Sequence, residues 1–73
     1  MSNGADENTI LEGVVTDTLK GAQFRVQLDD ERVILAHLSG RMRKFYIKVV
    51  LGDRVKVEFT PYDPDRGRII ERL

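Results

Sequence analysis

One ten-residue stretch of this chain has the composition of a phosphate-binding segment. Residues 39–48, SGRMRKFYIK, contain no carboxylate and four cations, which are Arg41, Arg43, Lys44 and Lys48. Guanidinium and ammonium groups bind phosphate oxygens and release counterions from a polyanion. The whole chain carries 12 Lys and Arg against 12 Asp and Glu, so its net charge is zero. The segment therefore indicates polyanion binding by a local surface, which the average charge does not indicate.

The charges are also unevenly divided along the chain. Residues 1–35 hold three bases and seven acids, for a net charge of −4, and residues 36–73 hold nine bases and five acids, for +4. Such asymmetry is typical of a surface that meets nucleic acid, and we expect the cations of the second half to share one face. The alternative is a solvated charged face without a partner.

Catalytic chemistry has little support in the residue types present. The chain has one His, His37, and no Cys, so it can form neither a thiolate zinc site nor a multi-histidine metal site. The Ser, Thr and acidic residues match no nucleophile motif and no glycine-rich phosphate loop. Asp63 and Asp65 lie in a proline-containing segment and are interpreted as turn formers. We therefore expect a protein that is not an enzyme and holds no metal or cofactor.

Three further side chains have chemistry that suits RNA. His37 either lies half-buried in a strand and hydrogen-bonds to the backbone, or stacks on a base from a ligand face; both interpretations stay open. Tyr46 and Tyr62 lie near the cations and provide flat rings. Because Phe45 and Tyr46 follow Met42 by three and four residues, we expect both to pack on the buried side of a helical turn.

The elements that must position these residues are short strands. Apolar residues alternate with polar ones in two segments, and β-branched residues are frequent in the others, as in strands. Gly13 lies inside the first strand and predicts a bulge or a sharp bend there. The five predicted strands are residues 10–17, 24–28, 33–38, 54–59 and 68–72.

A helical turn is expected between the third and fourth strands, because Ser39 is a good N-cap. Five short strands with this turn predict an all-β, five-stranded Greek-key barrel of the oligonucleotide/oligosaccharide-binding (OB) fold, whose second and third strands commonly form the ligand face. An SH3-like barrel stays open, since the strand count does not separate the two. Residues 1–8 have no apolar anchor and are expected to form a flexible tail, which leaves residues 9–73 as a single domain.

Targeting signals are not recognisable in the sequence. No apolar run approaches the roughly 20 residues of a membrane-spanning helix. The first nine residues, MSNGADENT, have neither the basic leader nor the apolar stretch of a secretion signal. We expect a soluble cytoplasmic protein.

Four strings of the sequence carry a family likeness: FRVQL at 24–28, AHLSGRMRKFYI at 36–47, GDRVKVEFTPYD at 52–63 and GRI at 67–69. Together they resemble bacterial translation initiation factor one, an S1-like OB-fold protein. The resemblance implies binding to 16S rRNA at the decoding A site of the small (30S) ribosomal subunit. It also implies that the protein blocks premature tRNA binding and assists the other two initiation factors. In this family the loop between strands one and two enters an rRNA groove and displaces two adenines.

The resemblance assigns RNA contacts by position. Lys20 and Gly21 fall in the inserted loop, His37 matches the family histidine, and we add Arg25 on the second strand. The segment around the helical turn and the C-terminal strand supply the others, which are Ser39, Gly40, Arg41, Arg43, Lys44, Tyr46, Lys48, Arg66, Arg68 and Arg72.

Two features depart from the family pattern. The loop reads LKGAQ where many members have a proline-asparagine pair. The acidic 29–31 turn, Glu71 and the terminal Leu73 make the chain less basic than several relatives. Affinity for the subunit is expected to be lower, or to depend more on the other factors.

Two other functions fit parts of the pattern. A general single-stranded RNA-binding or cold-shock-like protein would need a surface of stacking aromatic residues, and the aromatic residues here mostly occupy expected core positions. A small protein-interaction module would use its oppositely charged halves to steer a protein partner.

Overall fold

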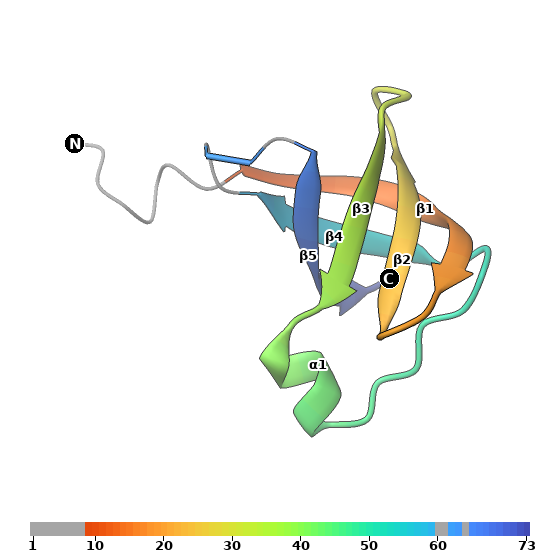
Figure 1. Cartoon of the computed structure of the whole chain (residues 1–73), viewed down its shortest axis with the longest axis vertical. Helices are drawn as coiled ribbons and strands as arrows, with labels where there is room; N and C mark the ends of the chain where they lie inside the picture. The colour runs from red at the N-terminus through yellow and green to blue at the C-terminus, as the bar shows by residue number, and fades with distance from the viewer. Residues whose placement is uncertain (1–8, 60–61, 64) are drawn as a thin grey trace.

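The chain forms a closed barrel of five strands with one short helix (Figure 1). The computed structural model describes residues 9–59, 62–63 and 65–73, so the predicted tail at 1–8 lies outside the described residues, as do Pro61 and Pro64. The elements in chain order are β1 (Thr9–Leu19), β2 (Gln23–Leu28), β3 (Val33–Leu38), α1 (Gly40–Lys44), β4 (Arg54–Phe59) and β5 (Arg66–Arg72). The predicted strands and helical turn are thus present, but β1 runs two residues beyond its predicted end at Asp17 and β5 starts two residues earlier than expected.

The strands close in the order β1-β2-β3-β5-β4, and β4 pairs with β1 to complete the barrel. The β3–β5 pair is parallel and the other four pairs are antiparallel. Closure pairs the edges that an open sheet would expose to other chains. The predicted OB-type arrangement is therefore the one observed, with α1 between β3 and β4.

The alternating pattern of the sequence places the core inside the barrel. Phe24, Val26 and Leu28 of β2 point inward and are at most 7% exposed, while the residues between them point outward. β4 follows the same rule, with Val55 and Val57 fully buried. Burial of these apolar side chains is the main term that stabilises so small a domain. The outer face is left to polar and charged residues.

Gly13 has a different role from the bulge predicted for it. The irregularity in the β1–β2 pairing lies between Val15 and Asp17. At Gly13 the backbone of β2 passes so close that a Cβ would lie 2.5 Å from the carbonyl oxygen of Gln27. Real Cβ atoms do not approach an oxygen so closely, so glycine is required by contact between the strands.

Helix α1 is fixed to the barrel through its first turn. The Ser39 hydroxyl accepts a hydrogen bond from the Met42 amide at 3.2 Å, as the predicted N-cap should. The Ser39 amide donates to the carbonyl of Ile69 in β5 at 3.0 Å. Met42 is 1% exposed and joins the barrel core. The start of the helix is therefore held by the hydrogen bond to β5, and Met42 packs the helix against the barrel core.

The expectation that Phe45 and Tyr46 pack in the core is wrong. Phe45 is 60% exposed and Tyr46 is 91% exposed. The helix ends at Lys44, and Tyr46 has a left-handed backbone with φ of 54°, so helical spacing from Met42 no longer applies. Val49, which is 7% exposed, returns the chain to the core instead.

Candidate nucleic-acid interface

The strand registers bring three basic segments to one end of the barrel. Gln23 pairs with His37, so the β1–β2 turn at residues 20–22 lies beside the end of β3 from which α1 begins. Because β5 is parallel to β3, it ends on the same side, and the Arg72 guanidinium donates to the carbonyl oxygen of Lys48 at 3.0 Å. We call this region, residues 20–22, 39–48 and 72, the α1 end. The acidic β2–β3 turn at 29–32 lies at the opposite end.

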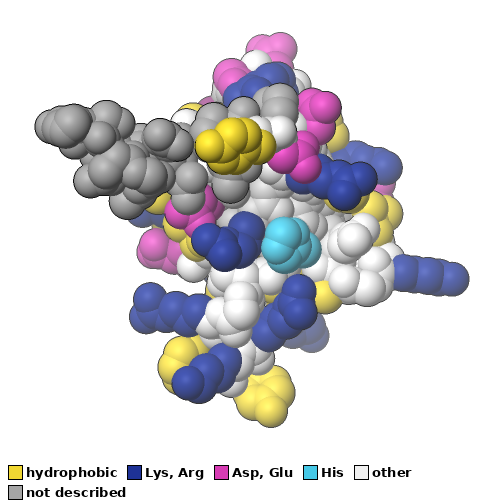
Figure 2. Space-filling model, turned by 60° about the vertical axis from the view of Figure 1, so that its left-hand side comes forward, with side chains coloured by type: hydrophobic (Ala, Val, Ile, Leu, Met, Phe, Trp, Pro, Cys, Tyr) yellow, Lys and Arg dark blue, Asp and Glu magenta, His cyan; other side chains and the backbone are white. Residues whose placement is uncertain are grey.

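The α1 end carries exposed cations that have no ion pair with any carboxylate in the described part of the chain. They are Lys20, Arg41, Arg43, Lys44, Lys48 and Arg72. Figure 2 shows Lys and Arg side chains over the lower part of the molecule, below the histidine, where no described Asp or Glu side chain is visible. The Asp and Glu side chains in that view lie beside the histidine or above it. These cations are therefore available to bind anions.

Helix α1 presents its cations because one of its residues is anchored in the core. Met42 is the buried residue of the helix, and Arg41, Arg43 and Lys44 on the other sides are exposed. The helix contains no acidic residue, and cations near a helix C-terminus interact favourably with the helix dipole. The result is a compact cationic surface on a short, immobilised element.

A second group of predicted residues lies on the outer face of β2, β3 and β5. His37 has Gln23 of β2 on one side and Arg68 of β5 on the other. It is exposed, so the interpretation as a half-buried histidine that bonds to the backbone is wrong. A hollow of about 410 Å³ on this face is lined by Gln23, Leu35, Ala36, His37, Glu58, Asp63, Arg66, Gly67 and Arg68.

The arginines of this face differ in their partners. Arg25 is 3.1 Å from Asp17, and Arg68 is paired with Glu58. Arg66 has no ion pair with a described carboxylate. The Arg25–Asp17 pair is exposed on both sides and hence weak, so a phosphate can replace Asp17 at small cost, whereas the Glu58 side chain is only 20% exposed. This face therefore carries carboxylates among its cations, unlike the α1 end.

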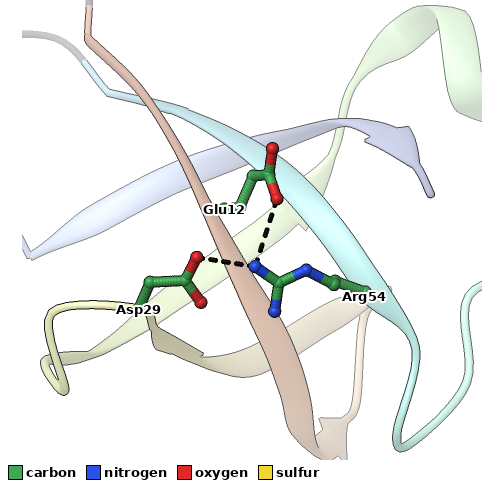
Figure 3. Close-up of polar contacts among 3 residues, drawn as sticks. All are labelled: Glu12, Asp29 and Arg54. Carbon is green, nitrogen blue, oxygen red and sulfur yellow. Dashed lines mark hydrogen bonds and ion pairs between the residues drawn. The ribbon is translucent and has the colours of Figure 1, made fainter.

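Other cations of the second half lie away from both surfaces, so the expectation of one shared face is met only in part. Arg54 lies between Glu12 at 3.1 Å and Asp29 at 2.6 Å (Figure 3). Hydrogen bonds to Asp29 and then to Glu12 raise the pKa of Arg54 above its ordinary value. Lys56 lies 3.8 Å from Glu71. The pairs with Glu12 and Glu71 join neighbouring strands, whereas Asp29 lies in the β2–β3 turn. Neither cation was predicted to contact RNA.

Three other predicted residues, Gly21, Ser39 and Gly40, shape the chain around these cations. Gly21 has φ of 75° and forms the tight β1–β2 turn next to Lys20, with open space around it. Ser39 is buried and its hydroxyl caps α1, so it positions the cations that follow. Gly40 is the first residue of α1 and has open space around it. Phe45 is an exposed aromatic residue that was not among the predicted RNA contacts. The expectation of only a single helical turn could have indicated that Phe45 lies beyond the helix and is exposed.

The described residues offer neither a metal-binding cluster nor a membrane-spanning helix. Those residues contain no group of three or more His, Cys, Asp or Glu that could hold a metal ion. Helix α1, the helix of the described residues, is too short to cross a bilayer.

Comparison with known proteins identifies the family. A family model described as "Translation initiation factor 1A / IF-1" matches residues 2–73. The solution structure of translation initiation factor one from the Wolbachia endosymbiont strain TRS of Brugia malayi is similar, with 43% identity, a TM-score of 0.79, and coverage of 99% of this chain and 85% of that one. The crystal structure of YjeQ from Thermotoga maritima is similar at 27% identity and a TM-score of 0.72, over 89% of this chain and 23% of that one. The chain therefore belongs to the translation initiation factor 1A / IF-1 family and has a role in translation initiation.

Proposed function

We propose that this protein binds 16S rRNA at the decoding A site of the small ribosomal subunit. The observation that carries the proposal is the α1 end, where six exposed cations have no ion pair with a described carboxylate in a chain of zero net charge. Such cations neutralise phosphates and release counterions. Family membership supports the ribosome as the source of the phosphates.

In this proposal the two surfaces have different tasks. The β1–β2 turn with Lys20 and Gly21 enters an rRNA groove, while the cations of α1 bind the phosphates on either side. Arg25, His37, Arg66 and Arg68 extend the contact over the outer face of β2, β3 and β5, where an exposed histidine can stack on a base. Ser39, Gly40, Tyr46, Lys48 and Arg72 complete the proposed interface.

The bound protein acts by occupancy. It fills the A site, prevents a tRNA from binding there too early, and assists the other two initiation factors through the altered subunit. Binding and orientation suffice for this role, so we propose that the protein is not an enzyme. Because initiation takes place on ribosomes in the cytoplasm, we propose the cytoplasm as its location.

Chemical footprinting of small subunits tests the proposal. With the protein added, protection is expected around the decoding site, together with a changed reactivity of two adenines there. The Arg41→Ala/Arg43→Ala/Lys44→Ala variant should lose these changes at a concentration where the wild type is saturating. Protection confined to another region of the subunit would refute the proposed site.

One observation favours a second candidate, a general single-stranded RNA-binding protein. Phe45, Tyr46 and Tyr62 are 60%, 91% and 86% exposed, so more aromatic surface is available for stacking than the sequence predicts. Affinity for intact small subunits should exceed affinity for random single-stranded RNA by a large factor if the first proposal holds. Equal affinities would support the second.

A further inference from the structure

The chain leaves α1 through two adjacent exposed aromatic residues. Phe45 is 60% exposed and Tyr46 is 91% exposed, although large apolar rings are usually buried at least in part. Neither ring belongs to the core cluster, whereas Met42 before them and Val49 after them in the chain are both buried in it. The fold therefore presents both rings to solvent between two anchored positions.

The backbone that presents them is held by hydrogen bonds. The amides of Phe45 and Tyr46 donate to the carbonyls of Arg41 and Arg43, both at 3.1 Å, and the Ile47 amide donates to the carbonyl of Met42 at 3.0 Å. These bonds close the C-terminus of α1 and fix Tyr46 in the left-handed region at φ of 54°. Glycine is the usual residue at such a position, because a side chain there is strained.

Neither capping nor packing therefore explains a tyrosine at position 46. A glycine would close the helix with less strain, and a polar residue would be better solvated than an exposed ring. A strained, exposed aromatic residue on a rigid backbone is a feature from which binding can be inferred. Its backbone is already ordered, so a ligand that covers the ring loses less conformational entropy on binding.

The charges around the rings indicate the ligand. Arg41, Arg43 and Lys48 lie in the same segment and have no ion pair with a described carboxylate. The Lys44 Nζ lies 5.8 Å from the centroid of the Phe45 ring. An apolar protein surface would desolvate these cations without pairing them, which is costly. An unpaired nucleotide offers a flat base for the ring and a phosphate for the cation.

We propose that Phe45 and Tyr46 form a stacking site for an unpaired RNA base, with the neighbouring cations bound to its flanking phosphates. The inference rests on the proposed function, since it takes RNA as the ligand. It adds a contact that depends on aromatic rings and hence is less sensitive to salt than the phosphate contacts.

Two substitutions at one position separate stacking from apolar contact. Tyr46→Phe keeps the ring, while Tyr46→Leu keeps apolar bulk and the same side-chain branch point but removes the ring. In binding to intact small subunits, Tyr46→Phe should stay within about twofold of the wild type and Tyr46→Leu should bind about tenfold or more weakly. Full affinity in Tyr46→Leu would overturn the proposal in favour of an apolar protein contact. Weak binding by both variants would also overturn it, because the hydroxyl would then be the essential group.

Folding and strain are controlled separately. Tyr46→Gly removes the ring and relieves the positive φ, and Glu31→Gly relieves a φ of 73° in the acidic turn at the other end. Both variants should keep or raise the wild-type Tm, and only Tyr46→Gly should bind subunits more weakly. A fall in Tm confined to Tyr46→Gly would assign the ring to the fold and count against the proposal.

A spectroscopic measurement reports on stacking directly. The chain has two tyrosines and no tryptophan, so Tyr62→Phe leaves Tyr46 as the single tyrosine emitter. An RNA oligonucleotide that copies the decoding region should quench this emission on binding. Unchanged emission in a bound complex would refute stacking while leaving the proposed function intact. If instead the wild type fails to bind small subunits at all, the proposed function fails.

Discussion

The salt dependence of subunit binding tests whether α1 is part of the RNA footprint. In the Arg41→Ala/Arg43→Ala/Lys44→Ala variant, three exposed cations are removed whose side chains have no ion pair with a described carboxylate. Each lost phosphate contact lowers the slope of log affinity against log salt by about 0.7 to 0.9. Three contacts therefore correspond to about 2 to 3 units of slope. When the salt concentration rises fourfold, the factor by which affinity falls should be about 20 to 40 times smaller for the variant than for the wild type.

The matched control removes the same number of charges from carboxylate-paired positions. Arg32, Arg54 and Lys56 each lie within 4.0 Å of an Asp or Glu, and their replacement by Ala changes the net charge equally. This variant should change the slope by less than about one unit. Affinities are measured by equilibrium binding of labelled protein to small subunits at several salt concentrations. If the two triple variants change the slope to the same extent, net charge and not the α1 end governs binding, and the reasoning is refuted.

The remaining predictions concern the fold and its pH dependence. Gly13→Ala should lower the Tm by roughly 5 to 20 °C, because the new Cβ meets the backbone of β2. Gly40→Ala has open space around the new Cβ, so it should leave the Tm unchanged or raise it. Circular dichroism on heating measures both Tm values, and equal changes in the two variants would contradict the contact argument. Ser39→Ala should destabilise the protein by about 0.5 to 2 kcal/mol in urea unfolding and weaken subunit binding, because the cap of α1 is lost; wild-type stability would argue against the cap. The Arg32 amide, which donates to Asp30, and the Arg32 guanidinium hold the pKa of Asp30 below its ordinary value. The ionised Asp30 carboxylate therefore stabilises the folded state fully above its unfolded-state pKa of about 3.9. This contribution is lost as the pH falls through the lower pKa that Asp30 has in the folded state. Asp30→Asn should therefore be less stable than the wild type at pH 7 but equal to it in strong acid, and a difference that persists in acid would contradict this assignment.

The parts of the fold that follow from local patterns could be predicted from the sequence. Alternation in β2 and β4 predicts which residues point inward, because successive side chains of a strand point to opposite faces. Ser39 could be recognised as an N-cap because capping depends on residue type and position alone. The turns at 20–22 and 29–32 follow from runs of polar residues and glycine.

Features that depend on where a short element ends could not be predicted in this way. Spacing from Met42 predicts that Phe45 and Tyr46 are buried only if the helix continues, and it ends at Lys44. The position of the bulge, between Val15 and Asp17 and not at Gly13, likewise depends on how two strands fit together. Such contacts between distant segments cannot be predicted from the local sequence pattern.

The candidate site was predictable in its composition but not in its grouping. The cations of 41–48 are adjacent in sequence, so they remain together in any fold. Lys20 and Arg72 join them only because the parallel β3–β5 pair and the β1–β2 turn bring distant segments to one end. The separation of Arg54 from the others depends on carboxylates of β1 and of the β2–β3 turn, which only the tertiary structure places beside it.

The central claim is that the α1 end faces the small subunit and the acidic turn faces away. The chain has no Cys, so Gly40→Cys and Glu31→Cys each create a single attachment point for an iron chelate that generates hydroxyl radicals. On bound subunits, the chelate at position 40 should cleave rRNA around the decoding site strongly, and the chelate at position 31 should cleave it weakly. Stronger or equal cleavage of the decoding site from position 31 would contradict the account.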